Sequence, residues 1–307
     1  MKLSRNGICW CGSNIKYKYC HYDLDTALSN EYVQVARKVY NRNWQKNSTH
    51  YAEQGCYDWM ASLLKPYAPE LILDVGCGAG SGIRSLLSMS NDRPVQVISL
   101  EENSECIDAA ESRLSRDGYE VSVVKRLHSI DRGGKKHVLG IEPGCLGAIG
   151  RVTLIEADVL LDDEELFSFL FDLPKFDAVT VWLMGTHLAR QNCINISPLK
   201  ISSSGEYRLR VQNKVYELAD QLLKSGGVLQ VVDRGEVPSA EALKDDFIQA
   251  HCEQASVTSL KVNALEYLSY NESESTRRIS MRPTIGKSGR LPDLSRKAMV
   301  SVVSVKP

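Results

Sequence analysis

Apolar residues recur at helical intervals in the first part of the chain. Two such runs cover residues 26–46 and 51–64, and Pro66 follows the second. Their apolar stripes consist of Tyr32, Val35, Val39 and Tyr40 in the first run and of Trp59, Met60, Leu63 and Leu64 in the second. A period of about 3.6 residues is typical of a helix with one buried face. The spacing therefore predicts a connecting helix within residues 25–50 and a second helix that ends before the proline.

From residue 71 onward, short apolar runs alternate with helical segments. The strand-like runs cover residues 71–75, 95–100, 152–157, 176–183, 226–233, 256–262 and 297–306. Helical spacing lies between them, at residues 84–89, 104–114, 212–224 and 239–251. Strands that alternate with helices are typical of a parallel sheet with helices on both faces. We therefore predict one α/β domain over residues 51–307.

Two segments interrupt this alternation. Residues 119–142 hold two β-like runs around Asp131-Arg132-Gly133-Gly134, which predicts a hairpin insertion with a glycine-rich turn. Residues 271–297 are rich in Ser, Arg and Pro and have little periodicity, which predicts a basic loop. The basic side chains are Lys125, Arg126, His128, Arg132, Lys135, Lys136 and His137 in the hairpin and Arg277, Arg278, Arg282, Lys287, Arg290, Arg296 and Lys297 in the loop. Each segment is either a solvated surface or a contact for an anionic or nucleic-acid partner.

Composition and charge fit a globular chain and name no partner. The 307 residues are 43% apolar and 24% charged, with a net charge of −1, so a sizeable core is expected and a strong basic field is not. No run approaches the roughly 18 apolar residues of a membrane span, and the first residues lack the apolar core of a signal peptide. We expect a cytoplasmic protein. The nine cysteines, an odd number, do not suggest a disulfide framework.

The first 24 residues hold a compact set of metal-ligating side chains. Cys9, Cys11, Cys20 and His21 form the pattern C-x-C-x8-C-H. Thiolates and imidazoles are the ligands that tetrahedral Zn²⁺ prefers. Four protein ligands leave no open coordination position, so the pattern predicts a structural zinc site rather than a catalytic one.

The residues around this pattern closely resemble the SEC-C zinc motif, best known from the C-terminal tail of the SecA translocation ATPase. Residues 5–22 read RNGICWCGSNIKYKYCHY, and the resemblance includes the four ligands together with Gly12, Ser13, Lys16, Tyr17 and Lys18. Trp10 stands where the family usually has proline. The resemblance implies a closed zinc knuckle, within residues 1–24, that docks onto proteins.

The stretch LILDVGCGAGSG, residues 71–82, carries the strongest sign of a ligand site. Asp74 lies near the end of the predicted strand, and Gly76, Gly78 and Gly80 follow at alternating positions before a helix. Glycines permit a positive φ and a close approach of the backbone to a ligand. The dinucleotide motif G-x-G-x-x-G has a different spacing, which disfavours an NAD-dependent oxidoreductase.

Acidic residues also end the next predicted strands. Glu101, with Glu102 adjacent, follows residues 95–100, and Asp158 follows residues 152–157. Together with Asp74 and the glycines, these motifs resemble those of class I S-adenosylmethionine (SAM) methyltransferases, from about residue 50 to the C-terminus. The resemblance implies a Rossmann-like sheet. It also implies a SAM site formed by Asp74, Gly76, Gly78, Gly80, Glu101 and Asp158. In this site Glu101 binds the ribose hydroxyls and Asp158 accepts a hydrogen bond from the adenine amino group.

Methyl transfer from SAM needs alignment of the nucleophile, and it needs a base only where the nucleophile is protonated. His187, just past the strand predicted at residues 176–183, is the best-placed candidate for that base. No [DNS]-P-P-[YF] follows the same strand, so the pattern of exocyclic-amine and glutamine methylation is missing.

We therefore predict a SAM-dependent methyltransferase whose zinc knuckle helps to recruit a macromolecular substrate. A docking knuckle favours a protein or ribosome-associated substrate, while RNA and small molecules stay alternatives. A hypothesis from another class is a non-catalytic adaptor that acts through the knuckle, with the SAM-type fold as a scaffold. The complete set of glycines and acids favours the enzyme. The acceptor atom and the oligomeric state do not follow from the sequence.

Overall fold

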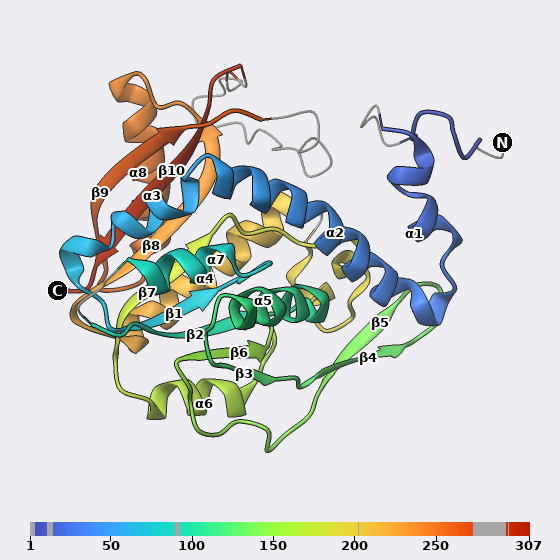
Figure 1. Cartoon of the computed structure of the whole chain (residues 1–307), viewed down its shortest axis with the longest axis horizontal. Coiled ribbons are helices and arrows are strands. Elements are labelled where there is room, and N and C mark those ends of the chain that lie inside the picture. The colour runs from blue at the N-terminus through green and yellow to red at the C-terminus, as the bar shows by residue number, and fades with distance from the viewer. Residues whose placement is uncertain (1–3, 11–14, 90–92, 202, 273–292, 294) are drawn as a thin grey trace.

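The computed structural model describes residues 4–10, 15–89, 93–201, 203–272, 293 and 295–307 (Figure 1). Its centre is an eight-stranded sheet. The strands lie side by side in the order β3 (Val121–Val124), β6 (Val152–Glu156), β2 (Gln96–Glu101), β1 (Leu71–Val75), β7 (Phe176–Trp182), β8 (Leu223–Glu236), β10 (Lys297–Val305) and β9 (Lys261–Ser269). The strands from β3 to β8 are parallel, whereas β10 runs antiparallel to both of its neighbours.

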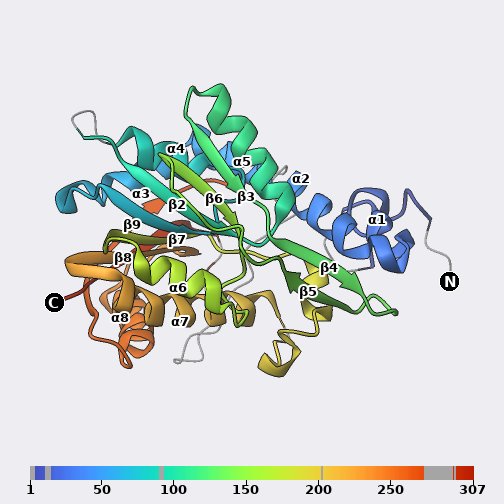
Figure 2. The same ribbon diagram turned by 90° about the horizontal axis from the view of Figure 1, so that it is seen from below.

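Helices cover both faces of this sheet, as Figure 2 shows from below. One face carries α2 (Tyr32–Glu53), α3 (Cys56–Ser62), α4 (Ser81–Ser88) and α5 (Ser104–Arg116), and the other carries α6 (Glu164–Asp172), α7 (Ser204–Leu222) and α8 (Glu241–Ala255). Neighbouring side chains of a strand point to opposite faces, so Ile72 of β1 lies in one core and Leu73 in the other. The predicted Rossmann-like fold class is confirmed.

The strand order reverses next to β1. From β1 the chain moves outward through β2 toward β6 and β3, and it then returns to the other side of β1 with β7 and β8. In open α/β sheets, ligands bind outside the carboxyl ends of the strands at such a switch point. The fold therefore places the residues that follow β1, β2, β6 and β7 around one crevice.

Helix α2 differs from its prediction, because it is one helix of 22 residues that crosses the expected break between residues 46 and 51. Asn47 and Ser48 look like surface residues in the sequence, yet both are buried. Ser48 Oγ donates to Ser81 Oγ at the start of α4, over 2.8 Å. The helix ends before Gly55, whose φ is +70°. The boundary drawn after residue 50 lies inside this helix.

The inserted hairpin is present but shorter than residues 119–142. Strands β4 (Leu127–Asp131) and β5 (His137–Ile141) pair antiparallel, while Val121–Val124 forms the edge strand β3 of the main sheet. The hairpin lies beside the start of α2, where Ser29 Oγ donates to Asp131 Oδ1 over 3.0 Å and Lys135 Nζ donates to the Leu24 carbonyl over 3.2 Å.

The C-terminal part of the chain differs from its prediction at β9. The strand expected at residues 256–262 instead begins at Lys261. Most of the basic loop predicted at residues 271–297, including Arg277, Arg278, Arg282, Lys287 and Arg290, lies outside the described residues, as does Cys11.

No disulfide joins the cysteines of the described residues. None of the helices in the described ranges combines the length and apolar character that a membrane crossing needs.

Candidate cofactor site and N-terminal metal cluster

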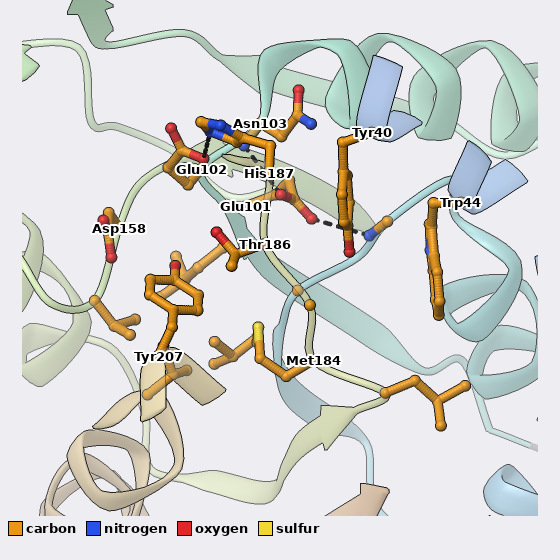
Figure 3. Close-up of a pocket in the computed structure, with 18 of the residues that line it drawn as sticks. Tyr40, Trp44, Glu101, Glu102, Asn103, Asp158, Met184, Thr186, His187 and Tyr207 are labelled. Atoms are coloured by element: carbon orange, nitrogen blue, oxygen red, sulfur yellow. Dashed lines mark hydrogen bonds and ion pairs between the residues drawn. The ribbon is translucent and has the colours of Figure 1, made fainter. Parts of the chain in front are cut away.

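A cavity opens at the carboxyl ends of β1, β2, β6 and β7 (Figure 3). It contains about 600 Å³ of space between the side chains, including space that is open to solvent. Its walls include Gly76 and Gly78 after β1, Glu101, Glu102 and Asn103 at the end of β2, Asp158 after β6, residues 183–187 after β7, Tyr40 and Trp44 from α2, and Tyr207 from α7. The cavity therefore unites segments that are far apart in the sequence.

The glycine loop needs its glycines for conformation and for space. Gly76 and Gly78 adopt φ values of +95° and +50°. A Cβ atom on Gly78 would lie 2.5 Å from Trp44 Nε1, and one on Gly76 would lie 2.9 Å from Met184 Cε. Gly80 has another role, because it precedes α4, packs against Ala110 and does not line the cavity. The loop is thus closely covered by α2 on one side.

Glu101 fixes this loop from the end of β2. One carboxylate oxygen accepts a hydrogen bond from the Gly78 N–H and the other accepts one from the Asn103 N–H, both over 3.0 Å. Burial raises the pKa of Glu101 to about 7, although both backbone bonds oppose the rise. Each carboxylate oxygen can accept a second hydrogen bond. Glu101 therefore keeps acceptor capacity at the wall of the cavity.

Asp74 is placed differently from the sequence expectation. Its carboxylate accepts hydrogen bonds from Ser99 Oγ of β2 and Thr180 Oγ1 of β7, each over 2.8 Å. It is buried within the sheet and does not line the cavity. Burial raises the pKa of Asp74 to about 6. This carboxylate links three neighbouring strands at the switch point.

Asp158 lies at the cavity wall, as expected, with both carboxylate oxygens engaged. One oxygen accepts from the Leu160 N–H over 2.9 Å, and the other forms an ion pair with Arg190. Arg190 belongs to the short helix η4 (Leu188–Asn192) that follows β7. Asp158 therefore holds this loop against β6.

Glu102, the alternative to Glu101 in the sequence, is the centre of a buried ionic cluster. It accepts from Arg37 Nη2 over 2.6 Å and pairs with His187 Nε2 over 2.9 Å, and Arg190 Nη1 lies 3.8 Å away. Burial opposes ionisation, but Arg37, His187 and Arg190 together hold the pKa of Glu102 well below its usual value. No local pattern marks Arg37 as a site residue, because a charged helical residue is normally exposed.

His187, the candidate base predicted from the sequence, lies at the cavity wall just after β7. It is 3% exposed. Its Nε2 faces the Glu102 carboxylate, and its Nδ1 finds no hydrogen-bond partner among the described residues. An ionised carboxylate favours a proton on Nε2, which leaves the Nδ1 lone pair free.

Near the N-terminus, Cys9 Sγ, Cys20 Sγ and His21 Nδ1 lie within 4.8 Å of one another. Nδ1 is 3.3 Å from the first sulfur and 3.1 Å from the second. Zinc–ligand bonds of about 2.0–2.3 Å at tetrahedral angles separate such atoms by roughly 3.5 Å. The three donor atoms could therefore hold a metal ion, and their chemistry suits zinc, while the fourth predicted ligand, Cys11, lies outside the described residues.

Comparison with known proteins supports the N-terminal motif. The SEC-C motif matches residues 5–23, which confirms the resemblance seen in the sequence. No curated protein sequence matches the chain.

Solved structures that resemble the chain include several methyltransferases. One is the N-methyltransferase NodS from Bradyrhizobium japonicum WM9 in complex with S-adenosyl-L-homocysteine (SAH), with 10% identity, a TM-score of 0.41 and coverage of 83% of this chain and 87% of that chain. Another is a SAM-dependent methyltransferase from Methanosarcina mazei, with 12% identity, a TM-score of 0.37 and coverage of 80% and 96%. A third is the methyltransferase domain of bacterial CtHen1, with 14% identity, a TM-score of 0.42 and coverage of 82% and 98%. At this level of similarity the comparison assigns no substrate to this chain.

Proposed function

We propose that the chain is a SAM-dependent methyltransferase that binds its cofactor in the cavity beside the glycine loop. The observation that carries the proposal is the position of Glu101. Its carboxylate lies at the switch point of a doubly wound sheet, bonded to the loop that follows β1. A carboxylate in this place can accept hydrogen bonds from both hydroxyls of a ribose.

The other walls suit the rest of the cofactor. SAM carries a cationic sulfonium. On the α2 side of the cavity, the rings of Tyr40 and Trp44 are stacked with their centroids 6.5 Å apart. Aromatic faces attract cations. Gly76 and Gly78 line the same cavity and leave their backbone without a side chain between it and the ligand. The residues present therefore fit the cofactor.

The protein's own contribution is binding, alignment and water exclusion. The bound cofactor supplies an activated methyl group. Glu101 and the glycine loop hold the cofactor, and α2 covers the loop. His187 is positioned to take a proton from the acceptor. Orientation of this kind can account for most of the acceleration of a group transfer.

The N-terminal knuckle has a separate role in this proposal. Cys9, Cys20 and His21, together with Cys11, hold structural zinc, and the knuckle recruits a macromolecular substrate. Trp10, which is 60% exposed, and Ile8, which is 57% exposed, give it an apolar outer surface. Such a surface suits contact with a protein and favours a protein or ribosome-associated substrate in the cytoplasm over RNA or a small molecule.

Calorimetric titration with SAH tests the cofactor assignment without a known substrate. The zinc-loaded protein is expected to bind one SAH per chain and no NAD. Glu101→Ala is expected to weaken binding at least tenfold, because the ribose hydroxyls lose their acceptor. The control is Glu120→Ala, which removes an exposed carboxylate near the sheet edge. Absence of SAH binding, or equal affinity in the wild type and Glu101→Ala, would contradict the proposal.

A further inference from the structure

We propose that a second cavity, adjoining the first at His187, binds the methyl acceptor, and that this acceptor is a hydroxyl on a compact, largely apolar group such as a phenol. The inference rests on the proposed methyltransferase function and names the acceptor chemistry of the same site.

The second cavity meets the first at three residues. Thr186, His187 and Tyr207 line both of them. The second cavity contains about 400 Å³ of space, part of it open to solvent, and lies between η4 and the start of α7. A molecule held there would contact the same histidine that borders the cofactor cavity, which is the placement that a methyl acceptor needs.

Apolar side chains dominate the part of this cavity that lies away from the junction. Leu188, Ile196 and Ile201 contribute to its wall, and Ile196 is only 3% exposed. Arg190 also borders the cavity, but its charge is offset by Asp158 and Glu102. A compact apolar group gains from burial against these three side chains. The other polar residues of the wall, Gln191 and Ser203, are uncharged, so the cavity offers no unpaired positive charge to a phosphate.

The junction has the chemistry of a general base. The ionised Glu102 carboxylate can only accept a hydrogen bond from His187 Nε2, 2.9 Å away, and it therefore favours the tautomer with a proton on Nε2 and an unprotonated Nδ1. Nδ1 is buried and has no partner among the described residues. A neutral amine attacks through its own lone pair and needs no such base, whereas a hydroxyl must lose its proton as it reacts. The pair therefore favours a hydroxyl acceptor.

Methyl transfer to the hydroxyl forms one bond to the methyl carbon and breaks another. The acceptor oxygen forms a bond to the methyl carbon while the bond from that carbon to sulfur breaks, and the bonding pair leaves with the sulfur. The hydroxyl proton passes to His187 Nδ1, and the resulting imidazolium keeps its Nε2 hydrogen bond to Glu102. Glu102 is a positioning residue, since it acts through the histidine.

The first test reads the histidine directly. Nitrogen-15 NMR of histidine-labelled, SAH-bound protein is expected to show His187 as the Nε2–H tautomer with an unprotonated Nδ1. His187→Gln identifies the signal. Glu102→Gln is expected to mix the two tautomers, a change that a purely structural role would not produce. An Nδ1–H tautomer in the wild-type protein would overturn the inference.

The second test uses p-cresol, which represents both a free phenol and a tyrosine side chain. With SAH present, saturation-transfer NMR is expected to detect p-cresol binding, and Leu188→Trp and Ile196→Trp are expected to reduce it by at least tenfold. Ile196 is buried, so Ile196→Trp can fail to fold. Leu188 is 47% exposed, so Leu188→Trp is expected to fold and provides the test in that case. Ile194→Trp, at a residue that is 40% exposed on the same segment, is the control. Binding of p-cresol that none of these variants alters would overturn the inference.

With SAM in place of SAH, methylation of the p-cresol oxygen is expected to fall about 100-fold or more in His187→Gln, within the range of general-base contributions. A tyrosine-containing tripeptide with blocked ends, run in parallel, distinguishes a protein acceptor from a free phenol, and methylation of either one supports a hydroxyl acceptor. Methylation of 4-methylaniline but of neither hydroxyl compound would overturn the inference. SAH affinity is measured for every variant, so that loss of the proposed function appears as loss of SAH binding instead.

Discussion

The raised pKa of Glu101 predicts that cofactor affinity depends on pH. Only the ionised carboxylate accepts hydrogen bonds with both oxygens, and the pKa in the ligand-free protein is about 7. By this value, about 90% of Glu101 is ionised at pH 8 and about 10% at pH 6. The apparent dissociation constant of SAH should therefore rise roughly tenfold between pH 8 and pH 6, which corresponds to about 1.4 kcal/mol.

The same shift acts on stability with the opposite sign. A carboxyl whose pKa is higher in the folded protein than in the unfolded chain stabilises the fold when it is protonated. This contribution of Glu101 is present below about pH 4.5 and is lost as the pH rises through about 7. Affinity for SAH should thus increase over the interval in which this contribution to stability decreases.

Calorimetry between pH 6 and pH 8 at constant ionic strength measures the effect. Glu101→Gln is the control, because it keeps the size of the side chain and removes the titration, so that any slope it retains belongs to the ligand or to other groups. The wild type is expected to show the tenfold change and the variant a weaker, nearly constant affinity. Equal slopes in the two proteins would refute the assignment of Glu101 to the cofactor site.

Three further perturbations test other parts of the structure. Gly78→Ala is expected to abolish SAH binding and to lower the melting temperature in a thermal scan, because its Cβ would lie 2.5 Å from Trp44 Nε1. The control is Gly118→Ala, also at positive φ, whose Cβ would meet no described residue within 4 Å apart from its own neighbours in the chain. It should lower the melting temperature less and leave SAH binding unchanged. Cys20→Ser should reduce zinc content, measured by mass spectrometry, from one ion per chain to less than half, with unchanged SAH affinity, and a joint loss of both would contradict two separate sites. Burial, aided by the nearby Arg190, lowers the pKa of His137 to about 4. Its stabilising contribution should therefore be lost as the pH falls from about 6.5 toward 4, by about 2 kcal/mol between pH 7 and pH 5. His137→Leu should remove that part of the loss in urea titrations, and an undiminished loss would show that the pH dependence has another origin.

The strands of the sheet were predictable because burial on both faces makes them short and almost continuously apolar. The run at residues 71–75 matches β1, and the runs at residues 152–157 and 297–306 overlap β6 and β10. Helix α2 was not predictable in full, because Asn47 and Ser48 are buried by partners distant in the sequence, which no local pattern reports. The start of β9 was missed for a similar reason, since Lys261 begins a strand whose pairing with β10 sets its register.

The candidate site likewise combines residues that the sequence predicts with residues that it does not. The glycine loop and Glu101 follow from local spacing, and the structure brings them together at the cavity. Asp74 has the same local signal but bonds to Ser99 and Thr180, because it is in register with both residues and shares one face of the sheet with them. Arg37 and Arg190 carry no local signal, since each is buried only through pairs with acids that lie far away in the chain. The roles given to the cofactor-site and zinc residues stay predictions until they are measured.

The most direct test of the central claim is transfer of a labelled methyl group. Purified zinc-loaded protein is incubated with methyl-tritiated SAM and a cell lysate, and aliquots are then treated with protease or with RNase. We expect macromolecules to carry label that protease releases and RNase does not. With Glu101→Ala we expect no label. Label released only by RNase would contradict the protein substrate, and no label above that with heat-inactivated protein would contradict the methyltransferase itself.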